Sequence, residues 1–204
     1  MNKIVSILSF MLLACGIQAC AQKESENPQT MKDKNVLVVF YSRIGDNYAV
    51  GNISKGNTHI VAEMIADKTG GRLFEIEPVN PYPEDYTECT EVAKREKEED
   101  ARPAIKNDIP VEDYDVIFIG YPIWWGDAPM PLHTFIDKHN WNGKIVIPFC
   151  THEGSGLAGT EEIMRNSCKG STVLRGLAIK GTVTQNQQDN ARNSINSWLD
   201  GLNF

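Results

Sequence analysis

The sequence predicts an α/β domain in which a five-stranded parallel sheet lies between two layers of helices. Unbroken apolar runs recur along the chain, and such runs suit strands that are buried on both faces. Segments with helical periodicity separate these runs, which is the alternation expected of parallel strands covered by helices. The 204 residues, of which 41% are hydrophobic and 23% charged, suit one such domain preceded by a targeting segment.

The strands are predicted from the apolar runs themselves. The run at residues 35–41 opens the domain, and the runs at 114–120 and 144–149 repeat its pattern. Two shorter runs, at 73–76 and 174–179, give weaker signals. Together these runs supply the five strands of the predicted sheet.

The helices are predicted from apolar residues at three- and four-residue spacing. The first has its apolar face between residues 60 and 65 and ends at Gly70-Gly71, because glycine readily adopts the left-handed conformation that closes a helix. The densely charged residues 84–100 are predicted to form a solvent-facing helix lying over the sheet. Further stripes mark later helices at Leu132, Phe135 and Ile136, at Leu157, Met164 and Cys168, and at Ala191, Ile195, Trp198, Leu199 and Leu202.

Residues 1–20 are predicted to be a secretory signal. Lys3 supplies a positive start, and the apolar stretch after it is shorter than the roughly 20 residues that span a bilayer. The polar residues 21–34 then form a flexible tether, and residues 35–204 form the domain. The alternative is a hydrophobic tail on a cytosolic protein.

The end of the signal leaves the form of export open. The Leu-Leu-Ala-Cys sequence that ends at Cys15 resembles the lipobox of bacterial lipoproteins, and Cys20 is a second candidate for lipid attachment. The Ala-Cys-Ala sequence around Cys20 also fits an ordinary cleavage site. We therefore expect an exported protein, either periplasmic or anchored in the cell envelope as a lipoprotein through Cys15 or Cys20.

Charge and cysteine content exclude several classes of function. The formal net charge of -7 argues against nucleic acid and anionic membranes as partners. Cys89, Cys150 and Cys168 cannot form a closed disulfide set, and we expect all three to be buried or partly buried thiols. The histidines lack the spacing of metal ligands, so no metal site is predicted.

The loop before the first predicted helix has the features of a phosphate site. Gly56-Asn57-Thr58 comes directly before the helix, whose start offers free backbone N–H groups and a positive dipole end. Gly56 lets the backbone come close to a ligand, and Asn57 and Thr58 add neutral donors. The alternative is that Asn57 simply caps the helix.

Two later loops suit a flat ring. Trp124 and Trp125 stand together after the third strand. Adjacent side chains in an extended segment point opposite ways, so at least one of them is expected to face the crevice, where a tryptophan can stack on a planar ring. The alternative is a hydrophobic plug. The loop at 151–156 is rich in Gly and Ser, whose backbone N–H groups can bond the edge of such a ring. For His152 within this loop, a structural or surface role is favoured over a catalytic one.

Four motifs in this order resemble the flavodoxin family, and they span nearly all of the domain. They are Phe40-Tyr41-Ser42, Gly56-Asn57-Thr58, Gly120-Tyr121-Pro122-Ile123-Trp124-Trp125-Gly126 and the loop 151–156. The resemblance implies a flavodoxin-like three-layer sandwich with strand order 2-1-3-4-5 and FMN as a non-covalent cofactor. It also implies that the FMN phosphate is held by Ser42, Gly56, Asn57 and Thr58. The isoalloxazine ring would be flanked by Pro122, Trp124, Trp125, Thr151, Gly154, Ser155 and Gly156.

The segment 43–55 departs from the family, whose phosphate loop is usually compact. It either folds away as a hairpin or leans over the flavin and restricts access to it. Three functions remain open: an electron carrier that docks with a redox partner protein, an FMN-dependent oxidoreductase that reduces a small acceptor such as a quinone, and a binding module without flavin. No residue is predicted to be catalytic, because the flavin itself carries the redox chemistry.

Overall fold

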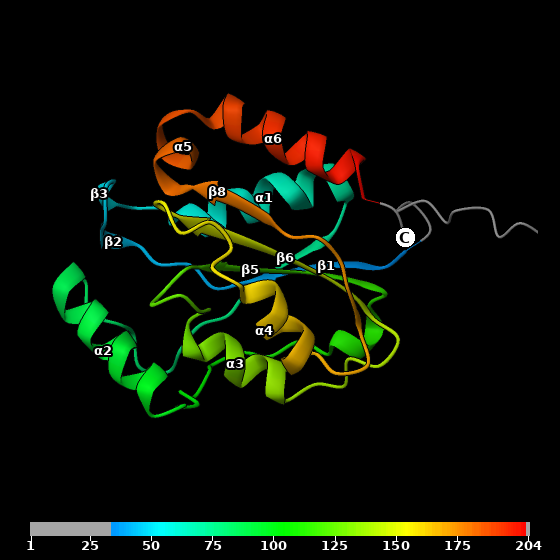
Figure 1. Ribbon diagram of the computed structural model, residues 1–204, viewed down its shortest axis with the longest axis horizontal. Coiled ribbons are helices and arrows are strands. Elements are labelled where there is room, and N and C mark those ends of the chain that lie inside the picture. The colour runs from blue at the N-terminus through cyan, green and yellow to red at the C-terminus, as the bar shows by residue number, and fades with distance from the viewer. Residues whose placement is uncertain (1–33, 203–204) are drawn as a thin grey trace, which may run out of the picture.

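The computed structural model describes residues 34–202 as a central sheet between two layers of helices (Figure 1). The predicted signal and all but the last residue of the predicted tether, with Cys15 and Cys20, lie outside the described residues. Within 34–202 no helix combines the length and the apolar character that a membrane crossing requires.

The sheet has the predicted parallel order. Its strands run in the order β4-β1-β5-β6-β7, and β8 pairs with β6 on the same side as β7. The predicted order 2-1-3-4-5 is therefore confirmed, with the fifth strand divided in two. The strands are β1 (Val36–Phe40), β4 (Arg72–Glu75), β5 (Val116–Pro122), β6 (Ile145–His152), β7 (Thr172–Val173) and β8 (Leu177–Lys180). A separate antiparallel hairpin joins β2 (Gly45–Asn47) to β3 (Gly51–Ile53).

Proline at position 148 explains why the last strand is divided. The carbonyl of Val146 accepts from the Leu174 amide, on the side of β6 where the last strand lies. In a parallel strand every second residue directs its backbone N–H and C=O to the same neighbour, so the backbone of Pro148 also faces the last strand. Proline has no N–H to give to the ladder. Pairing with β7 ends at Val146, and pairing with β8 resumes at Phe149. The gap between the two short strands therefore lies where the missing donor would have been needed.

Helices cover both faces of the sheet. On one face lie α1 (Asn57–Thr69), α5 (Gly181–Asn186) and α6 (Gln188–Asp200), and on the other lie α3 (Met130–Asp137) and α4 (Thr160–Ser167) (Figure 1). The short 3-10 helix η2 (Val111–Asp113) precedes β5. As predicted, α1 ends at Gly70, which has a φ of 71° and donates its N–H to the Ala66 carbonyl.

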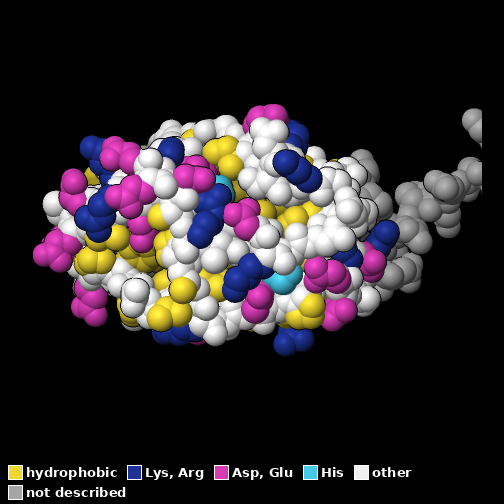
Figure 2. All heavy atoms as spheres, turned by 90° about the horizontal axis from the view of Figure 1, so that it is seen from below, with side chains coloured by type: hydrophobic (Ala, Val, Ile, Leu, Met, Phe, Trp, Pro, Cys, Tyr) yellow, Lys and Arg dark blue, Asp and Glu magenta, His cyan; other side chains and the backbone are white. Residues whose placement is uncertain are grey.

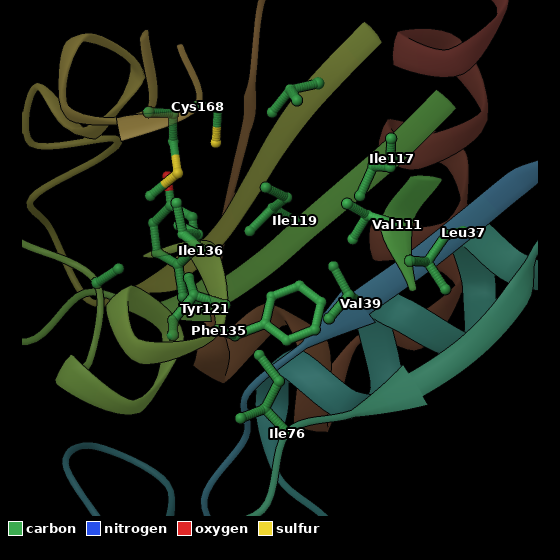
Figure 3. Close-up of a cluster of buried hydrophobic side chains, with 14 of the residues drawn as sticks. Leu37, Val39, Ile76, Val111, Ile117, Ile119, Tyr121, Phe135, Ile136 and Cys168 are labelled. Carbon is green, nitrogen blue, oxygen red and sulfur yellow. The ribbon is translucent and has the colours of Figure 1, made fainter. Parts of the chain in front are cut away.

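Each face of the sheet has its own buried core, because alternate strand residues point to opposite sides. Along β1, Leu37 and Val39 enter the core under α3 and α4, whereas Val38 and Phe40 enter the core under α1 and α6. Figure 3 shows the first of these cores, with the Phe135 ring of α3 pointing toward β1. The three long apolar runs, which form β1, β5 and β6, are thus strands buried on both faces, as predicted.

The charged helix α2 (Tyr86–Glu98) forms as predicted, with only Cys89 and Ala93 buried. Its position differs from the prediction, since it packs beside α3 and β2 near the carboxyl ends of the strands and does not lie over the sheet face (Figure 1). Figure 2 shows acidic and basic side chains mixed over this side of the molecule, with hydrophobic side chains exposed toward the α2 end. The helix therefore helps to enclose the loops where ligands bind in parallel sheets.

Candidate functional site

A cavity of about 300 Å³ opens at the carboxyl ends of the strands. Its walls come from five segments: the hairpin region, the start of α1, the first two turns of α2, the end of β5 with the loop after it, and the end of β6 with the loop after it. Of the residues that the sequence predicted for the site, the cavity is lined by Asn57, Pro122, Trp124, Trp125 and Thr151. The others, which are Ser42, Gly56, Thr58, Gly154, Ser155 and Gly156, lie outside this lining.

The start of α1 is held by contacts behind the cavity. The Ser42 hydroxyl accepts a hydrogen bond from the His59 amide at 3.1 Å. A Cβ on Gly56 would lie 2.1 Å from that hydroxyl oxygen, so only glycine lets the two segments approach this closely. Thr58 and Thr151 are both buried, and their hydroxyl oxygens lie 2.8 Å apart. These contacts tie the helix start to the loop before it and to β6.

Asn57 is oriented by a residue that sequence reasoning missed. Gln185 of α5 donates through Nε2 to the Asn57 Oδ1 at 2.8 Å and to the Lys55 carbonyl at 2.8 Å. With its oxygen occupied in this way, Asn57 keeps its amide N–H groups as donors. A lone glutamine in a polar helix carries no sequence signal, so Gln185 could not have been found without the fold.

The two tryptophans have different environments, yet both line the cavity, because the chain turns at Trp125 and is not extended there as the prediction assumed. Trp124 packs edge-on against Tyr41 and Tyr82, with ring centroids 5.5 and 4.9 Å away. Trp125 is 51% exposed and has a φ of 52°, an uncommon conformation for a bulky residue. Its Nε1 donates to the Thr90 carbonyl at 3.0 Å, which fastens the loop after β5 to α2. Trp124 and Trp125 both line the cavity.

The loop after β6 is braced by its own histidine. His152 Nδ1 accepts hydrogen bonds from the Gly154 amide at 2.9 Å and the Gly156 amide at 3.1 Å. The backbone donors expected to bond a flat ligand are therefore bonded to His152 here. Burial lowers the pKa of His152, and Lys180 lowers it further, whereas Glu153 opposes the shift. The structural role favoured for His152 is present, and its ring also lines the cavity.

The segment 43–55 folds as the hairpin β2–β3, yet it does not fold away. Asn47 and Tyr48 line the cavity, and the Tyr48 ring lies 6.0 Å from the Tyr86 ring of α2. Arg43 at the base is only 9% exposed. Its guanidinium donates to the carbonyls of Asp46, Pro83, Glu84 and Asp85, so it joins the hairpin to the segment before α2.

Arg43 also brings a buried positive charge to the cavity wall. None of the salt bridges formed within residues 34–202 involves it. Its neighbour Cys89 lines the same wall, and burial raises the pKa of that thiol while Arg43 opposes the rise. Cys89, Cys150 and Cys168 are all buried free thiols, as expected.

The arrangement suits one kind of ligand. Aromatic side chains on two sides of the cavity can pack against a flat ring. The start of α1, where no acidic residue occupies the first turn, attracts an anionic group. A molecule that joins a flat aromatic ring to an anionic tail fits both features, with the tail directed toward Asn57.

Comparison with known proteins agrees with this geometry. A family model described as flavodoxin matches residues 48–198. A candidate flavoprotein from Bacteroides eggerthii is 29% identical, with a TM-score of 0.64, and the match covers 82% of this chain and 96% of that one. A second candidate flavoprotein, from Bacteroides uniformis, is 25% identical, with a TM-score of 0.62 and coverage of 81% and 97%.

More distant structures share the fold. A flavoprotein from Lactobacillus acidophilus, solved in complex with FMN, is 21% identical, with a TM-score of 0.57 and coverage of 76% of this chain and 99% of that one. No curated protein matches the chain.

Proposed function

This chain belongs to the flavodoxin family, and from that premise we propose that it binds one FMN in the cavity and transfers electrons to a partner protein. The observation that carries the proposal is the cavity itself. It brings Trp124 and Trp125 together with the start of α1, where Asn57 keeps its amide donors. The matching flavoprotein from Lactobacillus acidophilus, which has the same fold, was solved with FMN.

The residues present fit FMN on two counts. The ring has aromatic partners in Trp124 and Trp125, one of which would stack on it. The phosphate has a neutral cradle at the start of α1. A Cβ on Gly56 would lie 2.6 Å from the Arg43 carbonyl, so only glycine lets the start of the helix lie this close to the segment after β1. FMN supplies the one- and two-electron chemistry when bound, and the protein binds, orients and partly shields it.

The test is titration of FMN fluorescence with purified protein, together with the visible spectrum. We expect quenching that saturates at one FMN per chain and a yellow protein that releases FMN on denaturation. The variant Asn57→Asp places a near-isosteric carboxylate beside the phosphate, so it should weaken FMN binding much more than binding of riboflavin, which has no phosphate. A colourless protein that does not quench FMN would leave the binding module without flavin as the remaining reading.

A second candidate function is reduction of a small acceptor such as a quinone. The observation that favours it is the hairpin, because Tyr48 and Tyr86 add an aromatic wall beyond the loops that hold the flavin. A partly enclosed pocket orients a small acceptor, whereas a carrier needs an exposed ring edge.

Shortening the hairpin separates these two functions. Replacing residues 44–54 with a short turn should leave FMN affinity largely unchanged, because Asn57 and the two tryptophans remain. If the protein reduces small acceptors, turnover of a quinone should fall far more than electron exchange with a protein acceptor such as a cytochrome. Equal effects on both acceptors would favour the carrier.

We also propose that the protein acts outside the cytoplasm, as the signal predicted at residues 1–20 supports. Substituting Cys15 and Cys20 separately by serine and fractionating cells tests this. If one substitution releases the protein from the membrane, that cysteine is the lipidated one. If the wild type and both variants are all recovered in the periplasm, the protein is exported in soluble form. Recovery in the cytoplasm refutes export.

A further inference from the structure

His152 holds its proton on a defined nitrogen. Two backbone N–H groups, from Gly154 and Gly156, point at the same Nδ1 at 2.9 and 3.1 Å. A protonated Nδ1 has no lone pair to accept them, so both bonds require a bare Nδ1. The neutral ring must then carry its proton on Nε2, where it is a hydrogen-bond donor.

The other end of the ring is available to a ligand. His152 lines the cavity, and no hydrogen bond joins its Nε2 to another residue within 34–202. In the same range, every buried side-chain nitrogen or oxygen has a partner. Because Nε2 has no such partner, it is accessible to solvent, and it belongs to a side chain that lines the cavity.

Burial favours the neutral form of the His152 ring. Burial disfavours the charged ring and lowers its pKa, and Lys180, which pairs with His152 across β6 and β8, acts in the same direction. The carboxylate of Glu153, which accepts from the amide and hydroxyl of Thr182, acts in the opposite direction.

We propose that His152 presents its Nε2–H to an acceptor atom of the bound ring, and that the amides of Gly154 and Gly156 fix the tautomer that makes this possible. The proposal rests on the proposed binding of FMN in this cavity. It gives the loop after β6 an indirect role in place of the direct one predicted from the sequence. The backbone amides donate to Nδ1 of the histidine, and its Nε2–H donates to the ligand.

Two variants separate the two ends of the ring. His152→Asn keeps an acceptor at the position of Nδ1, because the asparagine Oδ1 is attached to the same carbon, but it removes the Nε2–H. His152→Gln places an amide donor near the position of Nε2 but removes the acceptor that braces the loop. Both side chains are neutral and polar, so each variant is the matched control of the other.

The variants should affect stability and binding differently. His152→Asn should melt close to the wild-type temperature yet bind FMN roughly two- to tenfold more weakly, the equivalent of one lost neutral hydrogen bond. His152→Gln should melt at a lower temperature, because two loop amides lose their partner. Its FMN affinity should be reduced less than its melting temperature would suggest, because an amide donor remains near the position of Nε2. If His152→Asn binds FMN as tightly as the wild type, the ring only braces the loop and the proposal is wrong.

The pH dependence gives a second readout. Lowering the pH through the depressed pKa of His152 protonates Nδ1 and ends both amide bonds, while Nε2–H remains a donor. The loop that orients the ring then loses its brace, so ligand affinity in the wild type should fall. Riboflavin is the probe for this titration, because it has no phosphate that titrates in the same range. The affinity of His152→Asn for riboflavin should stay level over the same interval, and a parallel fall in both proteins would contradict the proposal.

A measurement without ligand distinguishes this proposal from the proposed function. Long-range proton–nitrogen correlation spectra of the ligand-free protein should show His152 with a bare Nδ1 and a protonated Nε2, and a protonated Nδ1 at pH 7.5 would overturn the proposal. If the wild type binds neither FMN nor riboflavin, the proposed function and this inference fall together. If it binds FMN and the asparagine variant binds equally well, only this inference falls.

Discussion

Replacing Arg43 with methionine should release the hairpin from α2. Methionine keeps the apolar stem and removes the guanidinium. Arg43 Nη2 donates to the carbonyls of Pro83 and Glu84 at 2.8 and 2.7 Å, with the Asp85 carbonyl farther away at 3.3 Å. Since Nη2 has two protons, these contacts amount to about two good bonds. A third runs from Nη1 to the Asp46 carbonyl.

Two opposing effects set the magnitude of this change. Three bonds from a charged donor contribute about 1.5–3 kcal/mol each. Against this, the wild type buries a guanidinium without a carboxylate partner, which costs several kcal/mol that methionine avoids. The carbonyls left behind also lie near the surface and regain water when the hairpin swings out. We therefore expect Arg43→Met to lower the free energy of unfolding by about 1–3 kcal/mol.

The assay combines denaturant unfolding with amide hydrogen exchange. Exchange should accelerate at residues 44–54 of Arg43→Met, while FMN affinity changes little because the start of α1 keeps its own contacts. Arg43→Lys is the control, since its single ammonium keeps the charge but cannot reach all the carbonyls, so it should recover part of the lost stability. Unchanged exchange at 44–54 together with unchanged stability would refute the reasoning.

Three further predictions concern buried contacts. Gly56→Ala should lower the free energy of unfolding by about 1–3 kcal/mol in urea titrations, because its Cβ would lie 2.1 Å from a hydroxyl oxygen, and an unchanged midpoint would contradict this. Thr58→Val and Thr151→Val should each cost about 1–3 kcal/mol by leaving the other hydroxyl unpaired, whereas the double variant should cost less than the sum of the two; an additive double variant would count against the bond. Burial raises the pKa of Cys150 and of Cys168 to about 12, so both thiols stay protonated at pH 8. Iodoacetamide should therefore modify them only after unfolding, and alkylation of the folded protein at the rate of a free thiol would contradict the burial.

The sheet could be predicted from sequence because of where its strands lie. A strand buried on both faces must be apolar at nearly every position, and β1, β5 and β6 therefore appear as unbroken runs. The divided strand was predicted as one piece at 174–179, because a run of apolar letters does not reveal which donors its neighbour lacks. The helix α5 was missed, since its six residues are too short for a periodic pattern.

The site was less predictable for a different reason. The tryptophan pair and the start of α1 carry recognisable side chains, whereas the contacts that shape the cavity run to the backbone. Arg43 donates to backbone carbonyls, and His152 accepts from backbone amides. Almost every residue type has these backbone groups, so the residue types that Arg43 and His152 contact do not reveal the contact in the sequence. Their discovery requires the fold.

The divided last strand has a consequence for behaviour at high concentration. An exposed sheet edge can recruit a strand from another molecule and start aggregation, and a longer continuous edge is the greater hazard. On the outer side of β6 the exposed edge consists of the two residues of β7 and the four of β8, interrupted opposite Pro148. A strand from a second molecule would lose its register at that interruption after a few hydrogen bonds. The proline that divides the strand thus also shortens the continuous edge on this side of the sheet.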